Sequence, residues 1–100
     1  MTFANVGTLG TLPGKRDDVI TILTRPSEEL GNAGCLLYEV GTNSEEPNTV
    51  FVAELWESAD AHKASLQLES IRAAIAEAMP LLSGEFGGYR FEVAGSPLHR

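Results

Sequence analysis

The sequence predicts a single α+β domain over residues 1–100, with a four-stranded antiparallel sheet and two helices in the order βαββαβ. Two observations predict it. Four segments rich in apolar and β-branched residues are interrupted by two segments whose apolar residues recur every three or four positions. No repeat, low-complexity stretch or linker divides the chain. This order is the ferredoxin-like, or split βαβ, arrangement, with both helices on one face of the sheet.

The first half of the sequence predicts a strand followed by a helix. Residues 3–11 mix apolar and β-branched side chains, and their two glycines permit a bulge or a close approach of backbones. After a turn at residues 12–15, the spacing of Val19, Ile22 and Leu23 predicts an amphipathic helix over residues 15–25. Pro26 ends this helix, and one further turn over residues 27–30 precedes Gly31.

A β-hairpin follows, with strands over residues 35–42 and 49–57 and a polar loop between them. Both strands are nearly continuous apolar runs, LLYEV and VFVAELW, and strands of this kind are usually covered on both faces. The predicted helices cover only one face. We therefore expect a symmetric homodimer in which the sheets of two copies pack against each other.

The second helical region begins after Ser58, a favourable N-cap, and Asp60 suits its first turn. A break is expected near residues 68–70, where Ser70 could cap a second segment. The helical stripe beyond the break consists of Ile71, Ile75, Ala78, Met79 and Leu82. Gly84, Gly87 and Gly88 are expected in the exit loop, and residues 89–94 in the fourth strand.

Composition excludes several classes of function. A formal net charge of −7 at pH 7 argues against nucleic acid and anionic membrane surfaces as partners. The start of the chain does not resemble a signal peptide and no apolar run is long enough to span a bilayer, so we expect a cytoplasmic protein. Two histidines and the single Cys35 do not supply a metal site, and no nucleotide motif occurs, so no cofactor is predicted. Cys35 is expected to be a small buried hydrophobe.

Five residues are candidates for chemistry, each with a structural alternative. His62 is the natural general base, or else an exposed or helix-capping histidine. Trp56 and Tyr38 could contact a flat aromatic ligand or only fill the core. Asn5 could donate a hydrogen bond to an anionic oxygen or only satisfy a bulge. Arg90 could supply positive charge or an ordinary salt bridge.

Two acidic residues, Glu39 and Glu54, occupy the middle of apolar strands. We expect them to pair with Arg90, with Lys63 or with a cation of the partner chain rather than to take part in acid-base chemistry.

Several segments together resemble the antibiotic biosynthesis monooxygenase (quinol monooxygenase-like) family. They are GCLLYEV at residues 34–40, a polar loop with Pro47, FVAELWES at residues 51–58 with Ala61-His62 after it, LPGK at residues 12–15 and PLL at residues 80–82. The resemblance implies a dimeric α+β barrel. It also implies an enzyme that oxygenates polycyclic phenols or dihydroquinones with O₂, without metal, flavin or haem.

The resemblance further implies residue roles. Asn5 would stabilise an oxyanion, Trp56 and Tyr38 would hold the ring system, His62 would take the phenolic proton, and Arg90 would supply positive charge. Many relatives carry the histidine nine positions after the tryptophan, where this chain has Ser65.

Two other functions stay open. One is a non-catalytic dimeric barrel that binds a small apolar ligand or acts in a stress response. The other is haem degradation, which ranks lower because those relatives place the iron-ligating histidine near Ile75 or Ala76 of this chain.

Overall fold

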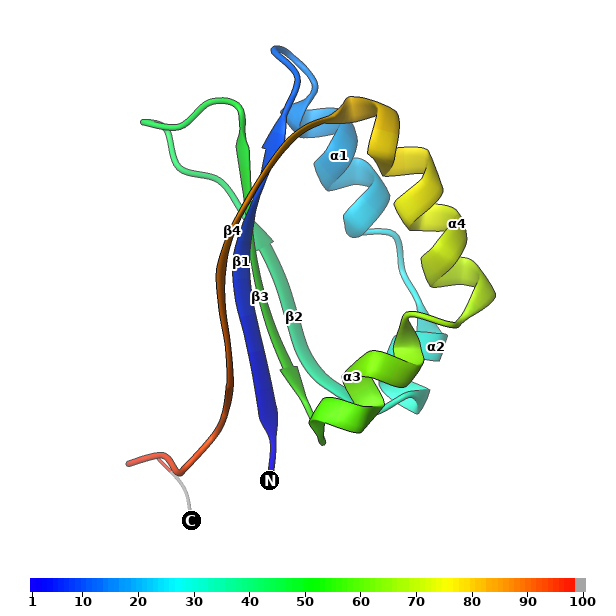
Figure 1. The fold of residues 1–100 in the computed structure, drawn as a ribbon, viewed down its shortest axis with the longest axis vertical. Helices are drawn as coiled ribbons and strands as arrows, with labels where there is room; N and C mark the ends of the chain where they lie inside the picture. Colours follow the sequence, from blue (N-terminus) through cyan, green and yellow to red (C-terminus); the bar gives the residue numbers. More distant parts are fainter. Residues whose placement is uncertain (99–100) are drawn as a thin grey trace.

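The computed structural model describes residues 1–98, in which helices cover one face of a four-stranded sheet (Figure 1). The elements are β1 (Phe3–Thr11), α1 (Arg16–Leu23), α2 (Glu28–Asn32), β2 (Cys35–Gly41), β3 (Thr49–Trp56), α3 (Ala59–Ser65), α4 (Glu69–Ala78), the 3₁₀ helix η1 (Met79–Leu81) and β4 (Leu82–Glu92). The strands lie in the order β2-β3-β1-β4, and all neighbours are antiparallel. The predicted ferredoxin-like α+β fold is confirmed. His99 lies outside the described residues.

The helix that follows β3 begins as the sequence predicts, but the next one does not. The Ser58 hydroxyl accepts a hydrogen bond from the Ala61 N–H at 3.0 Å and so caps α3. The prediction that Ser70 caps α4 is wrong. Helix α4 begins one residue earlier, at Glu69, with Leu68 in the N-cap position and no side-chain cap. None of the helices within residues 1–98 is long and apolar enough to cross a membrane.

Strand β4 is longer than the sequence predicts, because it begins at Leu82 and includes the three glycines expected in a loop. Gly88 has a φ of +128°, and a Cβ added there would lie 2.2 Å from the carbonyl oxygen of Val6. Only glycine therefore fits where β4 lies against β1. The glycines that look like loop residues in the sequence allow two strands to approach closely.

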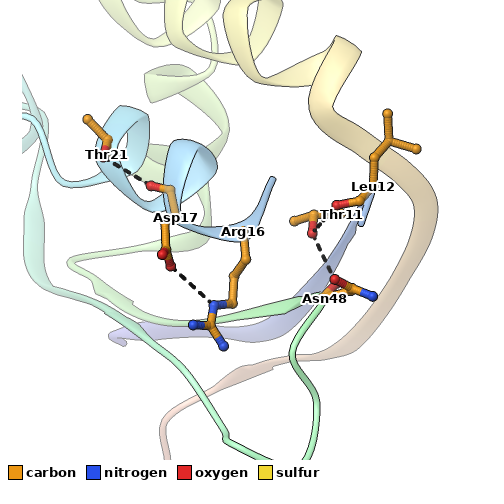
Figure 2. Close-up of polar contacts among 6 residues, drawn as sticks. All are labelled: Thr11, Leu12, Arg16, Asp17, Thr21 and Asn48. Atoms are coloured by element: carbon orange, nitrogen blue, oxygen red, sulfur yellow. Dashed lines mark hydrogen bonds and ion pairs between the residues drawn. The ribbon is translucent and has the colours of Figure 1, made fainter. Parts of the chain in front are cut away.

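The turn after β1 joins the strand to the first helix at the end of the sheet opposite Trp56 and α3 (Figure 1). The single hydroxyl hydrogen of buried Thr11 is shared between the carbonyl oxygens of Leu12, 3.1 Å from Oγ1, and Asn48, 3.3 Å from it (Figure 2). Arg16 and Asp17 form an ion pair at 3.3 Å beside it. The Thr11 contacts hold the hairpin loop against the end of β1, whereas the ion pair lies within the first turn of α1.

The two faces of the sheet differ in what covers them. On the inner face, toward the helices, Val50 and Val52 of β3 pack with Val19 of α1 in the buried core. The outer face has no covering element among residues 1–98, and most of its side chains are apolar, with Thr8 and Glu39 as polar exceptions. The outer face exposes Val6, Leu37, Tyr89 and Phe91, with exposed fractions of 42%, 42%, 80% and 50%.

Candidate functional site

A row of polar residues crosses the inner face of the sheet, one from each strand. Tyr38 of β2 pairs with Glu54 of β3, Glu54 pairs with Asn5 of β1, and Asn5 pairs with Arg90 of β4. Directly opposed residues in antiparallel strands present their side chains on the same face. Three residues singled out separately in the sequence, Tyr38, Asn5 and Arg90, therefore share this row, and Glu54 stands between them.

The Glu54 carboxylate is the centre of the site. Its Oε2 accepts a hydrogen bond from Asn5 Nδ2 at 2.8 Å, and its Oε1 accepts one from Trp56 Nε1 at 3.0 Å. His62 Nε2 lies 3.9 Å from the same Oε1, beyond hydrogen-bond distance. The Glu54 and His62 side chains are each only 11% exposed. Hydrogen bonds to an ionised acceptor of this kind offset part of the cost of burying its charge.

His62 reaches this carboxylate because the Ser58 cap sets the start of α3 over the inner face. The imidazole packs against Phe3, with ring centroids 5.5 Å apart, and meets Trp56 edge-on at 5.3 Å. His62 is buried, so the expectation of an exposed or helix-capping histidine is wrong. Trp56 is only 1% exposed and fills the core, one of its two expected roles, and its indole N–H also donates to Glu54. It does not line the cavity described next, and its contact with an aromatic ligand stays a prediction.

A cavity of about 240 Å³, called here the inner cavity, opens on the polar row. Its lining consists of Asn5, Gly7, Thr8, Leu9, Tyr38, Val52, Glu54, Phe86, Gly87 and Arg90. A second hollow beside β4 shares four residues with it: Asn5, Phe86, Gly87 and Arg90. His62 contacts the inner cavity only indirectly, through Glu54. The cavity thus combines a carboxylate, an amide, a phenol and a guanidinium with apolar walls.

A bulge in β2 brings Tyr38 into the row. The register shifts between Cys35 and Leu37, so Cys35 and Tyr38 both face inward although they lie three positions apart. Burial, with the nearby Glu54 charge and Cys35 as smaller causes, raises the pKa of Tyr38 to about 12. Its hydroxyl is therefore a neutral hydrogen-bond donor at neutral pH.

Cys35 is half-buried, and its Sγ donates to the Leu37 carbonyl oxygen at 3.4 Å. Burial raises the pKa of the Cys35 thiol, and the Glu54 charge adds to the effect. A raised pKa favours the thiol over the reactive thiolate.

Arg90 and Glu54 do not form the ion pair that the sequence suggested. Within residues 1–98 no carboxylate oxygen lies within 4.0 Å of the Arg90 guanidinium, and Glu54 has no lysine or arginine partner. The partners of Glu54 are instead the neutral donors Asn5 and Trp56. Within the same residues no three His, Cys, Asp or Glu side chains are grouped so as to hold a metal ion.

Glu54 is the residue that sequence reasoning missed as a member of the site. One signal was available: Glu54 and Trp56 lie two positions apart in a predicted strand, so their side chains share a face. A carboxylate on the same face as a buried tryptophan is well placed to accept its indole N–H.

A four-stranded antiparallel sheet in the order βαββαβ, with helices on one face and a polar cavity on that same face, defines a ferredoxin-like α+β protein. The model of the antibiotic biosynthesis monooxygenase family matches residues 2–77, and the chain belongs to this family. The matched segment includes Asn5, Tyr38, Glu54, Trp56 and His62, whereas Arg90 lies beyond it.

Solved structures agree with this assignment. A protein of Chloroflexus aurantiacus J-10-fl, provisionally named an antibiotic biosynthesis monooxygenase, is 32% identical, with a TM-score of 0.83 and 96% of each chain covered. Two proteins with the same provisional name share the fold. That of Caulobacter crescentus CB15 is 23% identical, with a TM-score of 0.82 and coverage of 94% of this chain and 91% of its own. That of Deinococcus radiodurans is 21% identical, with a TM-score of 0.77 and coverage of 96% and 95%. No curated protein matches the chain significantly.

Proposed function

We propose that the protein is a cofactor-independent monooxygenase that uses O₂ to oxidise a phenolic or dihydroquinone substrate. The observation that carries the proposal is the convergence of Asn5, Tyr38, Glu54 and Arg90 on one cavity, with His62 close behind Glu54. Oxidation of a phenol by O₂ requires a proton acceptor and groups that stabilise the resulting anion. The inner cavity offers both types of group beside apolar walls that suit an aromatic ring.

Arg90 and Asn5 are the proposed binding groups for the phenolate oxygen. Arg90 lines the cavity and has no carboxylate within 4.0 Å among residues 1–98, so its charge is available to an anion. Asn5 donates one amide hydrogen to Glu54, which fixes its orientation, and a primary amide has a second hydrogen to donate. The neutral Tyr38 hydroxyl can donate at the other end of the row.

Glu54 is the proposed first acceptor of the phenolic proton, and His62 a proposed second one. Glu54 lines the cavity, whereas His62 Nε2 lies 3.9 Å from its Oε1. A small movement of either side chain would close this gap to hydrogen-bond distance. The arrangement supports a proton path from the substrate through Glu54 to His62, and this assigns His62 a role without direct contact with the substrate.

The proposed reaction balances with the substrate and O₂ alone. Deprotonation makes a ring carbon nucleophilic, and a C–O bond to O₂ forms at that carbon. The O–O bond then breaks as a hydrogen leaves the same carbon. One oxygen stays as a quinone carbonyl, and the other leaves as water with the two hydrogens lost from the substrate. The substrate supplies all four electrons that reduce O₂.

Oxygen uptake tests this proposal. Metal-free protein is mixed with a panel of dihydroquinones and anthrones, and uptake is compared for wild type, Asn5→Ala and Glu54→Gln. We expect each substitution to lower kcat/KM by about 100-fold, the usual loss of one oxyanion donor or acid-base group. Asn32→Ala, at the exposed end of α2, is the matched control and should retain full activity. Wild-type uptake no faster than that of both variants would refute the assignment.

A non-catalytic ligand-binding protein is the second candidate, and the burial of His62 away from the cavity favours it. The two functions separate on one result. Binding of a phenol in the inner cavity is detected by changes in the NMR signals of the Tyr38 ring. Binding without O₂-dependent turnover would support the second candidate.

The functional unit that we propose is a homodimer joined through the outer faces of two sheets. The exposed apolar side chains of Val6, Leu37, Tyr89 and Phe91 support it, since soluble monomers rarely expose a contiguous patch of this kind. Each copy would then carry its own inner cavity.

A further inference from the structure

A larger cavity, distinct from the inner cavity and from the hollow beside β4, is formed mainly by helices. This helical cavity has a volume of about 620 Å³ and lies between the segment after α1, helix α2 and helix α4. In Figure 1 the segment from α1 to α2 and the helix α4 lie across from each other on the same side of the sheet. The apolar walls of the helical cavity include Ile22, Leu23, Pro26, Leu30, Ile71 and Ala74. None of these residues belongs to the polar row.

Tyr38 forms part of the wall of both cavities. Within residues 1–98 it is the only residue that lines both the inner cavity and the helical cavity. The inner cavity alone, at 240 Å³, is smaller than the range of about 300–1,000 Å³ typical of ligand pockets, whereas the helical cavity lies within that range. A ligand whose polar head occupies the inner cavity would extend into the helical cavity at the Tyr38 ring, the one side chain that lines both among residues 1–98.

The charges around the helical cavity indicate what kind of extension it would accept. Arg25 donates hydrogen bonds to both carboxylate oxygens of Glu77, each at 2.7 Å. This bidentate ion pair neutralises the positive charge of Arg25. Glu28 and Glu29 also line the cavity and add negative charge. A chain that ends in a carboxylate would be repelled here, so a neutral hydrocarbon chain suits the cavity better.

We infer that the helical cavity binds an uncharged hydrocarbon extension of the substrate, so that the substrate is an amphiphile with a phenolic head in the inner cavity. The identity of the head rests on the proposed function. The extension rests on the apolar walls, on the shared Tyr38 and on the acidic rim.

A series of hydroquinones with alkyl chains of increasing length tests this inference. Binding is measured by calorimetry without O₂, so that no turnover occurs. Because a buried methylene is stabilising, affinity should rise about fourfold per CH₂ until the helical cavity is full and then stay constant. A hydroquinone whose chain has the same length but ends in a carboxylate should bind more weakly than the one with a neutral chain end, because Glu28 and Glu29 line the helical cavity. Affinity that is independent of chain length would overturn the inference.

Two substitutions, one that makes the helical cavity smaller and one that makes it larger, test where the alkyl chain binds. Ala74→Phe fills part of the helical cavity and should move the plateau to shorter chains, whereas Leu30→Ala enlarges it and should move the plateau to longer ones. Ala64→Phe adds the same ring to an exposed site on α3 that lines none of these cavities, and should leave the series unchanged. Circular dichroism checks that each variant folds. A plateau that does not move in either folded cavity variant would place the chain elsewhere and overturn the inference.

The same titrations separate this inference from the proposed function. If the wild-type plateau and its shifts are found but no hydroquinone is turned over, the helical cavity is a chain-binding site and the monooxygenase proposal fails. If short hydroquinones are oxidised but longer chains bring no gain in affinity, the monooxygenase stands and the inference fails.

Discussion

On each face of the sheet, the polarity of the side chains differs from the polarity that the surroundings predict. The inner face is covered by helices at β2 and β3, yet a polar row crosses it from Tyr38 through the nearly buried Glu54 to Arg90, which is exposed on the edge strand β4. The outer face is uncovered within residues 1–98, yet it exposes Tyr89 and Phe91. Soluble proteins usually bury apolar side chains and expose charged ones. Each departure therefore marks a place where the sequence serves something other than the stability of a lone chain.

The departures differ in the kind of partner they indicate. Burial of a carboxylate costs several kcal/mol of desolvation unless hydrogen bonds offset it, so a hydrogen-bonded glutamate on this face agrees with the proposed site for protons or anions. An exposed apolar patch costs little in one chain but is stabilising when a complementary surface covers it. The inner face therefore agrees with the proposed binding of a small polar ligand head, and the outer face agrees with the proposed contact to a second copy of the protein.

Removing an apolar side chain from the outer face should have the largest effect. Burial of a phenylalanine contributes about 1.5–3 kcal/mol, and a two-fold interface contains Phe91 twice. We expect Phe91→Ser to weaken dimerisation by roughly 100-fold or more, as measured by sedimentation equilibrium.

Phe86 offers a matched control on the same strand. Phe86 pairs with Leu9 in the register of β4 and β1 and lines the inner cavity, so its side chain lies on the inner face. Phe86→Ser should therefore leave association unchanged. Equal weakening by the two variants, or a wild type that stays monomeric at all concentrations, would contradict the contrast between the faces.

Truncating the tryptophan of the inner face should cost about 3–5 kcal/mol of unfolding free energy, because Trp56 is 1% exposed and its removal leaves a cavity. Urea denaturation of Trp56→Ala, followed by circular dichroism, measures this loss. Trp56→Phe retains a ring against His62 but removes the donor to Glu54 and should cost less. A loss as large for Trp56→Phe as for Trp56→Ala would mean that the indole N–H, rather than packing, supplies the stability.

The titration of Tyr38 should reveal how dry the inner face is. Its folded pKa of about 12 lies above the unfolded value of about 10, so the folded state binds the proton more tightly. The stability linked to Tyr38 is therefore complete below pH ~10 and is lost as the pH rises to ~12, by about 2–3 kcal/mol. Urea denaturation between pH ~10 and ~12 measures this loss of stability. Tyr38→Phe should remove the part of the pH dependence that comes from Tyr38. Tyr89→Phe, on the outer face, should leave it in place.

The sequence allowed the fold to be predicted because its signals are local. Apolar spacing predicted α1, continuous apolar runs predicted the hairpin, and Ser58 predicted the start of α3. The start of β4 was missed because glycines resemble a loop unless the neighbouring strand is known. At Gly88 the requirement comes from the backbone of Val6, and no local pattern records that contact.

The site was only half predictable, because it depends on register. Asn5, Tyr38 and Arg90 could each be singled out as unusual in a strand, but the pairing of Asn5 with Glu54 joins residues 49 positions apart. The inward direction of Tyr38 depends in addition on the bulge before Leu37. Glu54 was taken for an ion-pair partner because the sequence does not reveal that the groups around a carboxylate are neutral donors.

The smallest expected effect concerns the contact that holds α3 over the inner face. The Ser58 hydroxyl satisfies the Ala61 N–H at 3.0 Å, so Ser58→Ala should cost about 1 kcal/mol of unfolding free energy. Ser70→Ala is the matched control: Ser70 lies inside α4 and caps nothing, and alanine favours a helix, so this change should be neutral or slightly stabilising. Because His62 lies on α3, loss of the cap should also broaden its ring NMR signals, whereas Ser70→Ala should not. Equal stability of the two variants would mean that the contacts of His62 with Phe3 and Trp56, rather than the cap, place the imidazole beside Glu54.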